Sequence, residues 1–166
     1  MITISRLLIL ILSFMVVACG YHLRGAYDLP KGMKAIYLEG GSSLLRDQLS
    51  TAVKSSSGQL VDSPEKAEVI LRIFDENIER RVLSLSGRGR SNDIELAGHL
   101  EFQLLDNKNG VLIGREPVDF KREYFNDQQD VIAKGNEEMV IKKELYTQVV
   151  RTIINRGRAV LEAKGK

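Results

Sequence analysis

The chain has 166 residues, in which 24 Lys and Arg residues nearly balance 22 Asp and Glu residues, for a formal net charge of +2. A charge so close to zero gives no support to a nucleic-acid partner, and we expect none. The single cysteine excludes an intramolecular disulfide, and the length fits one ordinary domain with one core.

The first 18 residues have the layout of a secretory signal peptide. Arg6 precedes the uncharged run LLILILSFMVV at residues 7–17. That run is too short to span a membrane, which takes about 20 apolar residues, but it has the length of a signal-peptide core. The next residues, VVAC at 16–19, resemble the bacterial lipobox, whose cysteine is lipidated. We therefore predict a lipoprotein signal peptide at 1–18 and lipidation of Cys19; an ordinary signal sequence with a chance cysteine is the alternative.

The segment behind the cysteine, residues 19–34, contains several glycines and a proline and is predicted to be an extended tether. Gly20, rather than an aspartate, follows the cysteine, and this resembles the sorting pattern that favours the outer membrane. A lipoprotein cysteine resembling this one carries three acyl chains. Because each buried CH₂ group contributes about 0.8 kcal/mol, such an anchor would be permanent. We expect a lipid-anchored protein on the periplasmic side of the outer membrane.

Residues 35–166 are predicted to form a single domain that begins with a strand and a helix. The apolar segment AIYLE at 35–39 is the strand. Ser42 or Ser43 is expected to cap the helix by accepting a hydrogen bond from a free backbone N–H group. The apolar residues of this helix recur at helical spacing: Leu45, Leu49, Ala52 and Val53.

Three long strands are predicted next. The first covers about 68–86 and is followed by a glycine-rich tip at 87–92. The second alternates apolar and polar residues from 93 to 104, which predicts one buried and one solvated face. After the turn DNKNG at 106–110, the third strand runs from 111 to about 125, bent near Pro117, where a ladder donor is missing.

A long helix is predicted from 127 to 163, with a break marked by Gly135-Asn136. The order is strand, helix, three strands, helix. Each predicted helix has an apolar stripe, and both stripes can be buried against one side of a sheet. We therefore predict a two-layer α/β sandwich, with two helices packed on one face of a four-stranded mixed sheet. The sheet is expected to be mixed because a helix joins the first two strands. The apolar row of the long helix is Ile141, Leu145, Val149 and Ile153.

A search for catalytic or metal-binding residues finds no converging set. A nucleophile needs a base and an orienting group, whereas His22 falls in the tether and His99 on the polar face of a strand. The adjacent carboxylates Asp75-Glu76 and Glu137-Glu138 are expected to be surface charges. We therefore expect no enzyme activity, no metal and no cofactor.

Three basic clusters remain. The loop GRGR at 87–90 lacks the lysine and hydroxyl residue of a Walker loop, but its two guanidiniums can bind phosphate bidentately. Lys121-Arg122 and Arg80-Arg81 are the other two clusters. The functional interpretation of these clusters is a local anion-binding site, and the alternative is a rim of solvated surface charges.

Several stretches resemble the LPS-assembly lipoprotein family LptE, also called rare lipoprotein B. They are CGYHLRG at 19–25, REYFND at 122–127, and AKGNEE at 133–138 leading into Ile141 and KELY at 143–146. The resemblance covers essentially the whole mature chain and implies an outer-membrane lipoprotein with two helices on a four-stranded sheet. It also implies a plug and folding partner of the β-barrel LptD that binds lipopolysaccharide (LPS) without catalysis.

Within that resemblance, the candidates for binding LPS phosphates are Arg88, Arg90, Lys121 and Arg122. Asp119 stands where the family has a basic residue. The polar strand faces and the segment DENIERR at 75–81 suit contact with a polar barrel lumen. Two alternative functions are an envelope hydrolase, for which the sequence offers no set of acid, base or nucleophile, and a generic envelope lipoprotein scaffold that binds another protein or an anionic polymer.

Overall fold

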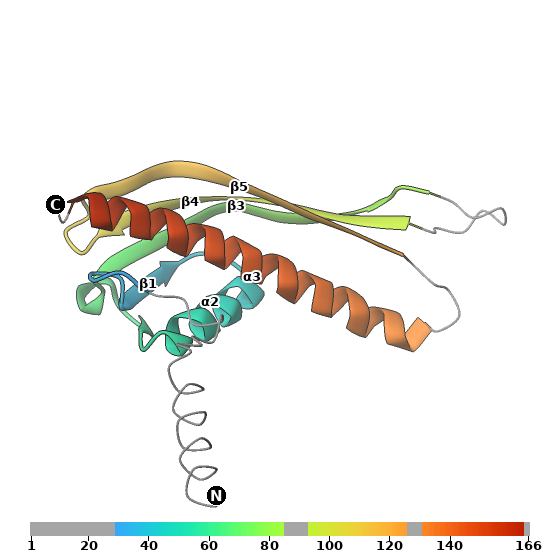
Figure 1. Cartoon of the computed structure of the whole chain (residues 1–166), viewed down its shortest axis with the longest axis horizontal. Coiled ribbons are helices and arrows are strands. Elements are labelled where there is room, and N and C mark those ends of the chain that lie inside the picture. The colour runs from blue at the N-terminus through green and yellow to red at the C-terminus, as the bar shows by residue number, and fades with distance from the viewer. Residues whose placement is uncertain (1–28, 85–92, 126–130, 165–166) are drawn as a thin grey trace, which may run out of the picture.

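Five strands and two helices form two layers, and both helices lie on the same face of the sheet (Figure 1). The computed structural model describes residues 29–84, 93–125 and 131–164; for 131–136 only the backbone is described. The elements are β1 (Ala35–Glu39), α2 (Ser43–Ser55), β2 (Gln59–Val61), a 3₁₀ turn (Pro64–Lys66), β3 (Val69–Val82), β4 (Asp93–Asp106), β5 (Val111–Phe125) and α3 (Val131–Lys164).

The sheet has the order β2-β1-β3-β4-β5 and is mixed. Strand β1 runs parallel to both β2 and β3, whereas β3, β4 and β5 are antiparallel to one another. The predicted two-layer α/β class with a mixed sheet is confirmed. The predicted count of four strands is wrong by one, because Gln59–Val61 forms an additional edge strand against Ala35–Tyr37. Three residues are too few to show an alternating pattern in the sequence.

Helix α2 forms as its sequence predicts. Ser42 is the N-cap, and its side chain accepts a hydrogen bond from Leu45 N at 3.2 Å. The helix ends where Ser57 takes a left-handed backbone conformation with φ 58°, and Gly58 N then donates to Val53 O at 2.9 Å. The residues at helical spacing are the buried ones: Leu45, Leu49, Ala52 and Val53.

Helix α3 packs along the long strands with its predicted apolar row buried. It runs from Val131 without interruption through Gly135-Asn136, so the predicted break is wrong. A glycine inside a helix costs about 1 kcal/mol, which the burial of a long apolar stripe offsets. The buried row is Ile141, Leu145, Val149 and Ile153.

The chain enters the core before β1. Leu29 and Met33 are buried members of the main hydrophobic cluster. An added Cβ on Gly157 of α3 would lie 3.0 Å from the sulfur of Met33, so the two segments pack closely. The last part of the segment expected to be a tether, residues 19–34, therefore belongs to the core.

A bulge in β3 connects the sheet to both helices. The register shifts between Phe74 and Asn77, where Asp75 has φ 46°. Glu76 thereby reaches the helix layer and accepts hydrogen bonds from Ser42 N at 2.7 Å, Ser42 Oγ at 2.5 Å and the Tyr146 hydroxyl. Burial and the contact with Glu76 raise the pKa of Tyr146 above its ordinary value. Glu76, expected to be a surface charge, is a structural acceptor instead.

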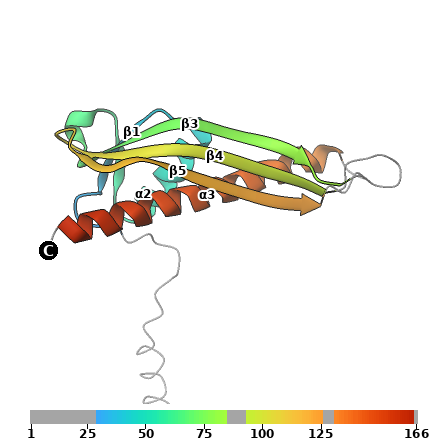
Figure 2. The same cartoon turned by 90° about the horizontal axis from the view of Figure 1, so that it is seen from above.

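The three long strands continue past the part of the sheet that α2 covers (Figures 1 and 2). Strand β1 pairs with β3 only as far as Arg72, so among the described strands the rest of β3 pairs with β4 alone. We name this part, formed by 77–82 of β3, 93–99 of β4 and 119–125 of β5, the distal ribbon. One face of the distal ribbon is turned toward α3, and the opposite face, the open face, is covered by no described helix.

Candidate functional site

The open face of the distal ribbon carries mostly charged side chains. Successive residues of a strand point to opposite faces, and the alternate residues of the three strands that face away from the helices form cross-strand rows. The rows are Asn77–His99–Asp119, Glu79–Ala97–Lys121 and Arg81–Glu95–Glu123.

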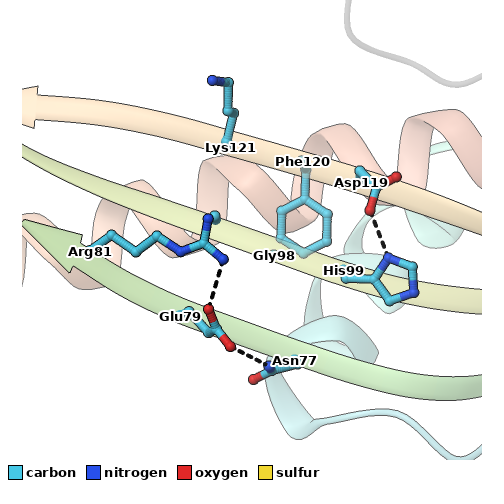
Figure 3. Close-up of a pocket in the computed structure, with 9 residues that line it drawn as sticks. Asn77, Glu79, Arg81, Gly98, His99, Asp119, Phe120 and Lys121 are labelled. Carbon is cyan, nitrogen blue, oxygen red and sulfur yellow. Dashed lines mark hydrogen bonds and ion pairs between the residues drawn. The ribbon is translucent and has the colours of Figure 1, made fainter. Parts of the chain in front are cut away.

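A hollow of about 540 Å³ lies on this face (Figure 3). In β4 its lining is made of Ala97, a small residue that points to this face, together with Gly98 and His99. The ring of Phe120, in the neighbouring strand, occupies the space beside Gly98, since an added Cβ there would lie 2.2 Å from a ring carbon. Longer side chains rise from β3 and β5 on either side, so the hollow has an apolar floor and charged walls.

Each basic side chain on the wall has a carboxylate neighbour. Arg81 donates to Glu79 at 2.9 Å, Lys121 Nζ lies 3.3 Å from Glu95 Oε2, and His99 Nδ1 lies 2.6 Å from Asp119 Oδ1. These pairs differ in exposure: the Lys121 side chain is 68% exposed, whereas that of Glu95 is 11% exposed.

The electrostatics of the hollow follow from these pairs. The hydrogen bond from Arg81 lowers the pKa of the Glu79 carboxyl, and the same contact raises the pKa of Arg81. Exposed ion pairs contribute at most about 1 kcal/mol. An anionic ligand can therefore replace Glu79 as the partner of Arg81 at little cost.

The structure separates the two predicted site residues of β5. Lys121 is on the open face, whereas Arg122 points toward α3, where its Nη1 lies 3.4 Å from Glu144 Oε2. Adjacent residues of a strand face opposite sides, so Lys121 and Arg122 cannot act on one face together. Arg88, Arg90 and Cys19 lie outside the described residues.

Arg81 lines the hollow, although in the sequence it stands only as part of a basic cluster and is not among the four candidates for binding LPS. The basic pair Arg80-Arg81 is visible in the sequence, but the bulge at Asp75 and Glu76 decides which of the two faces away from the helices. The register then places Arg81 one row from Lys121.

Within 29–84, 93–125 and 131–164, no three His, Cys, Asp or Glu residues come together as metal ligands. Over the same described ranges, none of the helices combines the length and apolar character needed to cross a membrane.

Comparisons with known proteins agree on one family. The LptE family model, described as Lipopolysaccharide-assembly, matches residues 33–156, more than half of the chain. An LPS-assembly lipoprotein LptE from Yersinia enterocolitica is 24% identical over 167 residues, covering 97% of this chain and 80% of that protein. One from Photorhabdus laumondii is 21% identical over 164 residues, covering 96% of this chain and 89% of that protein.

Solved structures share the fold. The solution NMR structure of an uncharacterized lipoprotein B from Nitrosomonas europaea has a TM-score of 0.66 at 27% identity, covering 87% of this chain and 94% of that one. The crystal structure of rare lipoprotein B from Shewanella oneidensis has a TM-score of 0.60 at 22% identity, covering 78% of this chain and 97% of that one. The family resemblance seen in the sequence is confirmed: this chain belongs to the LptE lipopolysaccharide-assembly family.

Proposed function

We propose that this protein is an outer-membrane lipoprotein that binds LPS and acts as the plug and assembly partner of the LptD β-barrel, without catalytic activity and without a cofactor. The family match over residues 33–156 carries this proposal. The relatives named above are LPS-assembly lipoproteins, and the open hollow of the distal ribbon supplies a binding surface of suitable chemistry.

The chemistry of the hollow supports LPS binding. Lipid A carries phosphates on an acylated sugar, so its binder needs cations beside apolar surface. Lys121 and Arg81 stand beside the floor formed by Ala97 and the Phe120 ring. Arg88 and Arg90 of the tip and Arg122 on the other face complete the proposed set of basic residues.

The open face also supports a partnership with a barrel. No helix among the described residues covers it (Figure 2), and along β5 its charges alternate in sign from Asp119 to Lys121 to Glu123. A polar face of this kind fits the polar interior of a large outer-membrane barrel.

The remaining parts of the proposal concern the anchor. Residues 1–18 act as a signal peptide, and Cys19 becomes the lipidated first residue of the mature protein. Residues 19–34 lead from the membrane to the single domain at 35–166. The domain then works on the periplasmic side of the outer membrane.

The partnership is tested by purifying the full-length lipoprotein from detergent-solubilised outer membranes and identifying bound proteins by mass. Recovery of LptD in a stoichiometric complex is expected. Recovery of the lipoprotein alone, under conditions that keep other barrel complexes intact, would reduce the function to that of a generic envelope scaffold.

LPS binding is tested with a variant in which Arg88, Arg90, Lys121 and Arg122 are all replaced by glutamine. We expect LPS affinity to fall at least about tenfold, because charge-assisted hydrogen bonds contribute about 1.5–3 kcal/mol each. Circular dichroism checks that the fold is kept. Unchanged affinity in the folded variant would remove these four residues from the site.

A further inference from the structure

The turn that joins β4 to β5 contains the single Asn-Gly linkage of the chain, Asn109-Gly110. Both residues are exposed to solvent. Asn109 has φ 62°, a left-handed backbone conformation that asparagine adopts more readily than most residues. Water therefore has free access to this linkage.

Asp106, the last residue of β4, holds this turn through its side chain and its backbone. Its Oδ1 accepts hydrogen bonds from Lys108 N at 2.8 Å and from Gly110 N at 2.7 Å. Asp106 N donates to Gly110 O at 2.8 Å, and Asn109 N donates to Asp106 O at 3.0 Å. An added Cβ on Gly110 would lie 2.6 Å from Asp106 Oδ2, so the carboxylate lies directly against the glycine.

An asparagine that precedes a glycine can lose its side-chain amide without an enzyme. The backbone nitrogen of the glycine gives its proton to water or hydroxide and attacks the side-chain carbonyl carbon of the asparagine. The new C–N bond closes a succinimide ring, and the side-chain nitrogen takes up a proton and leaves as ammonia. One water molecule then opens the ring at either carbonyl, which yields aspartate or isoaspartate. Glycine favours ring closure because it has no Cβ to hinder the approach.

The hydrogen bond from Gly110 to Asp106 opposes the first step of this reaction. The nitrogen of Gly110 must lose the proton that it donates to the carboxylate, and the resulting anion would be repelled by the same carboxylate. A hydrogen bond to a charged acceptor is also stronger than one between neutral groups. The hydrogen bonds from Gly110 and Lys108 lower the pKa of Asp106, so its carboxylate is charged at neutral pH and is a poor base.

We infer that Asn109 is a site of spontaneous deamidation and that the Asp106 carboxylate restrains the reaction by holding the N–H group of Gly110. Water is the co-reactant. Either product places a new carboxylate in the turn that Asp106 closes, and isoaspartate also adds one CH₂ group to the backbone of the turn. Both changes weaken the connection between β4 and β5. This inference does not depend on LPS binding or on the barrel partnership proposed above.

The experiment incubates the purified full-length lipoprotein in detergent micelles at neutral pH and follows deamidation by peptide mass spectrometry. The wild type is compared with Asp106→Ala, which removes the acceptor for Gly110 N. The matched control variant is Asp47→Ala, which removes an exposed carboxylate of α2. Asn107 is the control within each protein, because it is exposed in the same turn but precedes Lys108, whose side chain hinders ring closure.

We expect Asn109 to react about tenfold faster or more in Asp106→Ala than in the wild type, because the variant lacks a hydrogen bond to a charged group. Asp47→Ala is expected to react at the rate of the wild type, and Asn107 is expected to react far more slowly than Asn109 in all three proteins. An equal or slower rate in Asp106→Ala overturns the restraint by Asp106. Reaction of Asn107 as fast as that of Asn109 overturns the assignment of the site.

Two further measurements keep the test decisive if Asp106→Ala does not fold. Asp106→Asn keeps an acceptor oxygen but not its charge, so Asn109 is expected to react faster than in the wild type; an equal rate overturns the role of the carboxylate. Unfolding the wild type in urea breaks the hydrogen bond from Gly110 without changing the sequence, and it is expected to speed the reaction of Asn109. If Asn109 stays intact in the unfolded chain, the deamidation site itself is overturned.

Discussion

Gly98 shows how a missing side chain makes room in the core of the distal ribbon, on the face turned toward α3. Its neighbour in the next strand, Phe120, places its ring where a Cβ would be. On the helix face the same ring packs against Tyr146, with 5.8 Å between the ring centroids. One glycine thus lets an aromatic ring complete the core beneath the hollow.

Replacing Gly98 by alanine is expected to destabilise the domain by about 1–3 kcal/mol, since the new methyl group forces the Phe120 ring to move. Urea denaturation followed by circular dichroism measures this. Gly114→Ala is the control, because an added Cβ on Gly114 of β5 meets no atom within 4 Å. Equal stability of the two variants would contradict the packing described for Gly98.

Tyr146→Phe is expected to lower the free energy of unfolding by about 1.5–3 kcal/mol, because the hydroxyl donates to the carboxylate of Glu76. The pKa of Tyr146 is raised from 10.0 in the fold, so its contribution is complete below about pH 10 and is lost as the pH rises further. Denaturation from pH 8 to 11 checks this. The wild type should lose more stability over that range than the variant, and parallel curves would contradict it.

The elements differ in how far the sequence predicts them. Alternation along 93–104 and the apolar row of the long helix predict β4 and the buried side of α3. Periodicity does not reveal β2, which has three residues, or the bulge at Asp75 and Glu76, because both features depend on pairing with distant strands. The alternation of side chains along β5 is local, and it already separates Lys121 from Arg122. That Arg81 lies near Lys121 depends on the register of β3, β4 and β5, which the sequence pattern does not reveal.

Helix α2 depends on a cap that the sheet reinforces. Ser42→Ala removes the acceptor for Leu45 N and one donor to Glu76, and is expected to cost about 1–2 kcal/mol. Thermal unfolding measures this loss. Ser43→Ala, at an exposed position one residue later, should cost much less; a larger loss for Ser43→Ala would mean that the N-cap is misassigned.

At the scale of the whole molecule, the two ends of the sandwich differ. Both helices and the full sheet enclose the core at one end, whereas α3 is the one described helix that accompanies the distal ribbon (Figure 1). The two-layer class follows from the order of the elements along the chain. How far the distal ribbon extends past α2 depends on the lengths and registers of the strands, which local sequence patterns do not determine.

The anchor proposed at Cys19 is tested on the whole protein. Cys19→Ser is expected to move the protein from the membrane fraction to the soluble fraction, because the acyl chains supply the membrane affinity. The intact masses of the wild type and the variant should differ by the mass of the attached acyl chains and their linker, beyond the small difference between cysteine and serine. A variant that stays in the membrane fraction would place the attachment elsewhere.

The arginines that face α3 from both edges of the distal ribbon also affect how neighbouring molecules meet. An uncovered strand edge is a template on which another chain can add a strand and begin to aggregate, and charged side chains that point inward from an edge strand prevent this. Arg80 and Arg122 are such residues, since a strand added beside either one would have to pack against a guanidinium held by α3. The protein can therefore present a long polar sheet without joining neighbouring copies edge to edge.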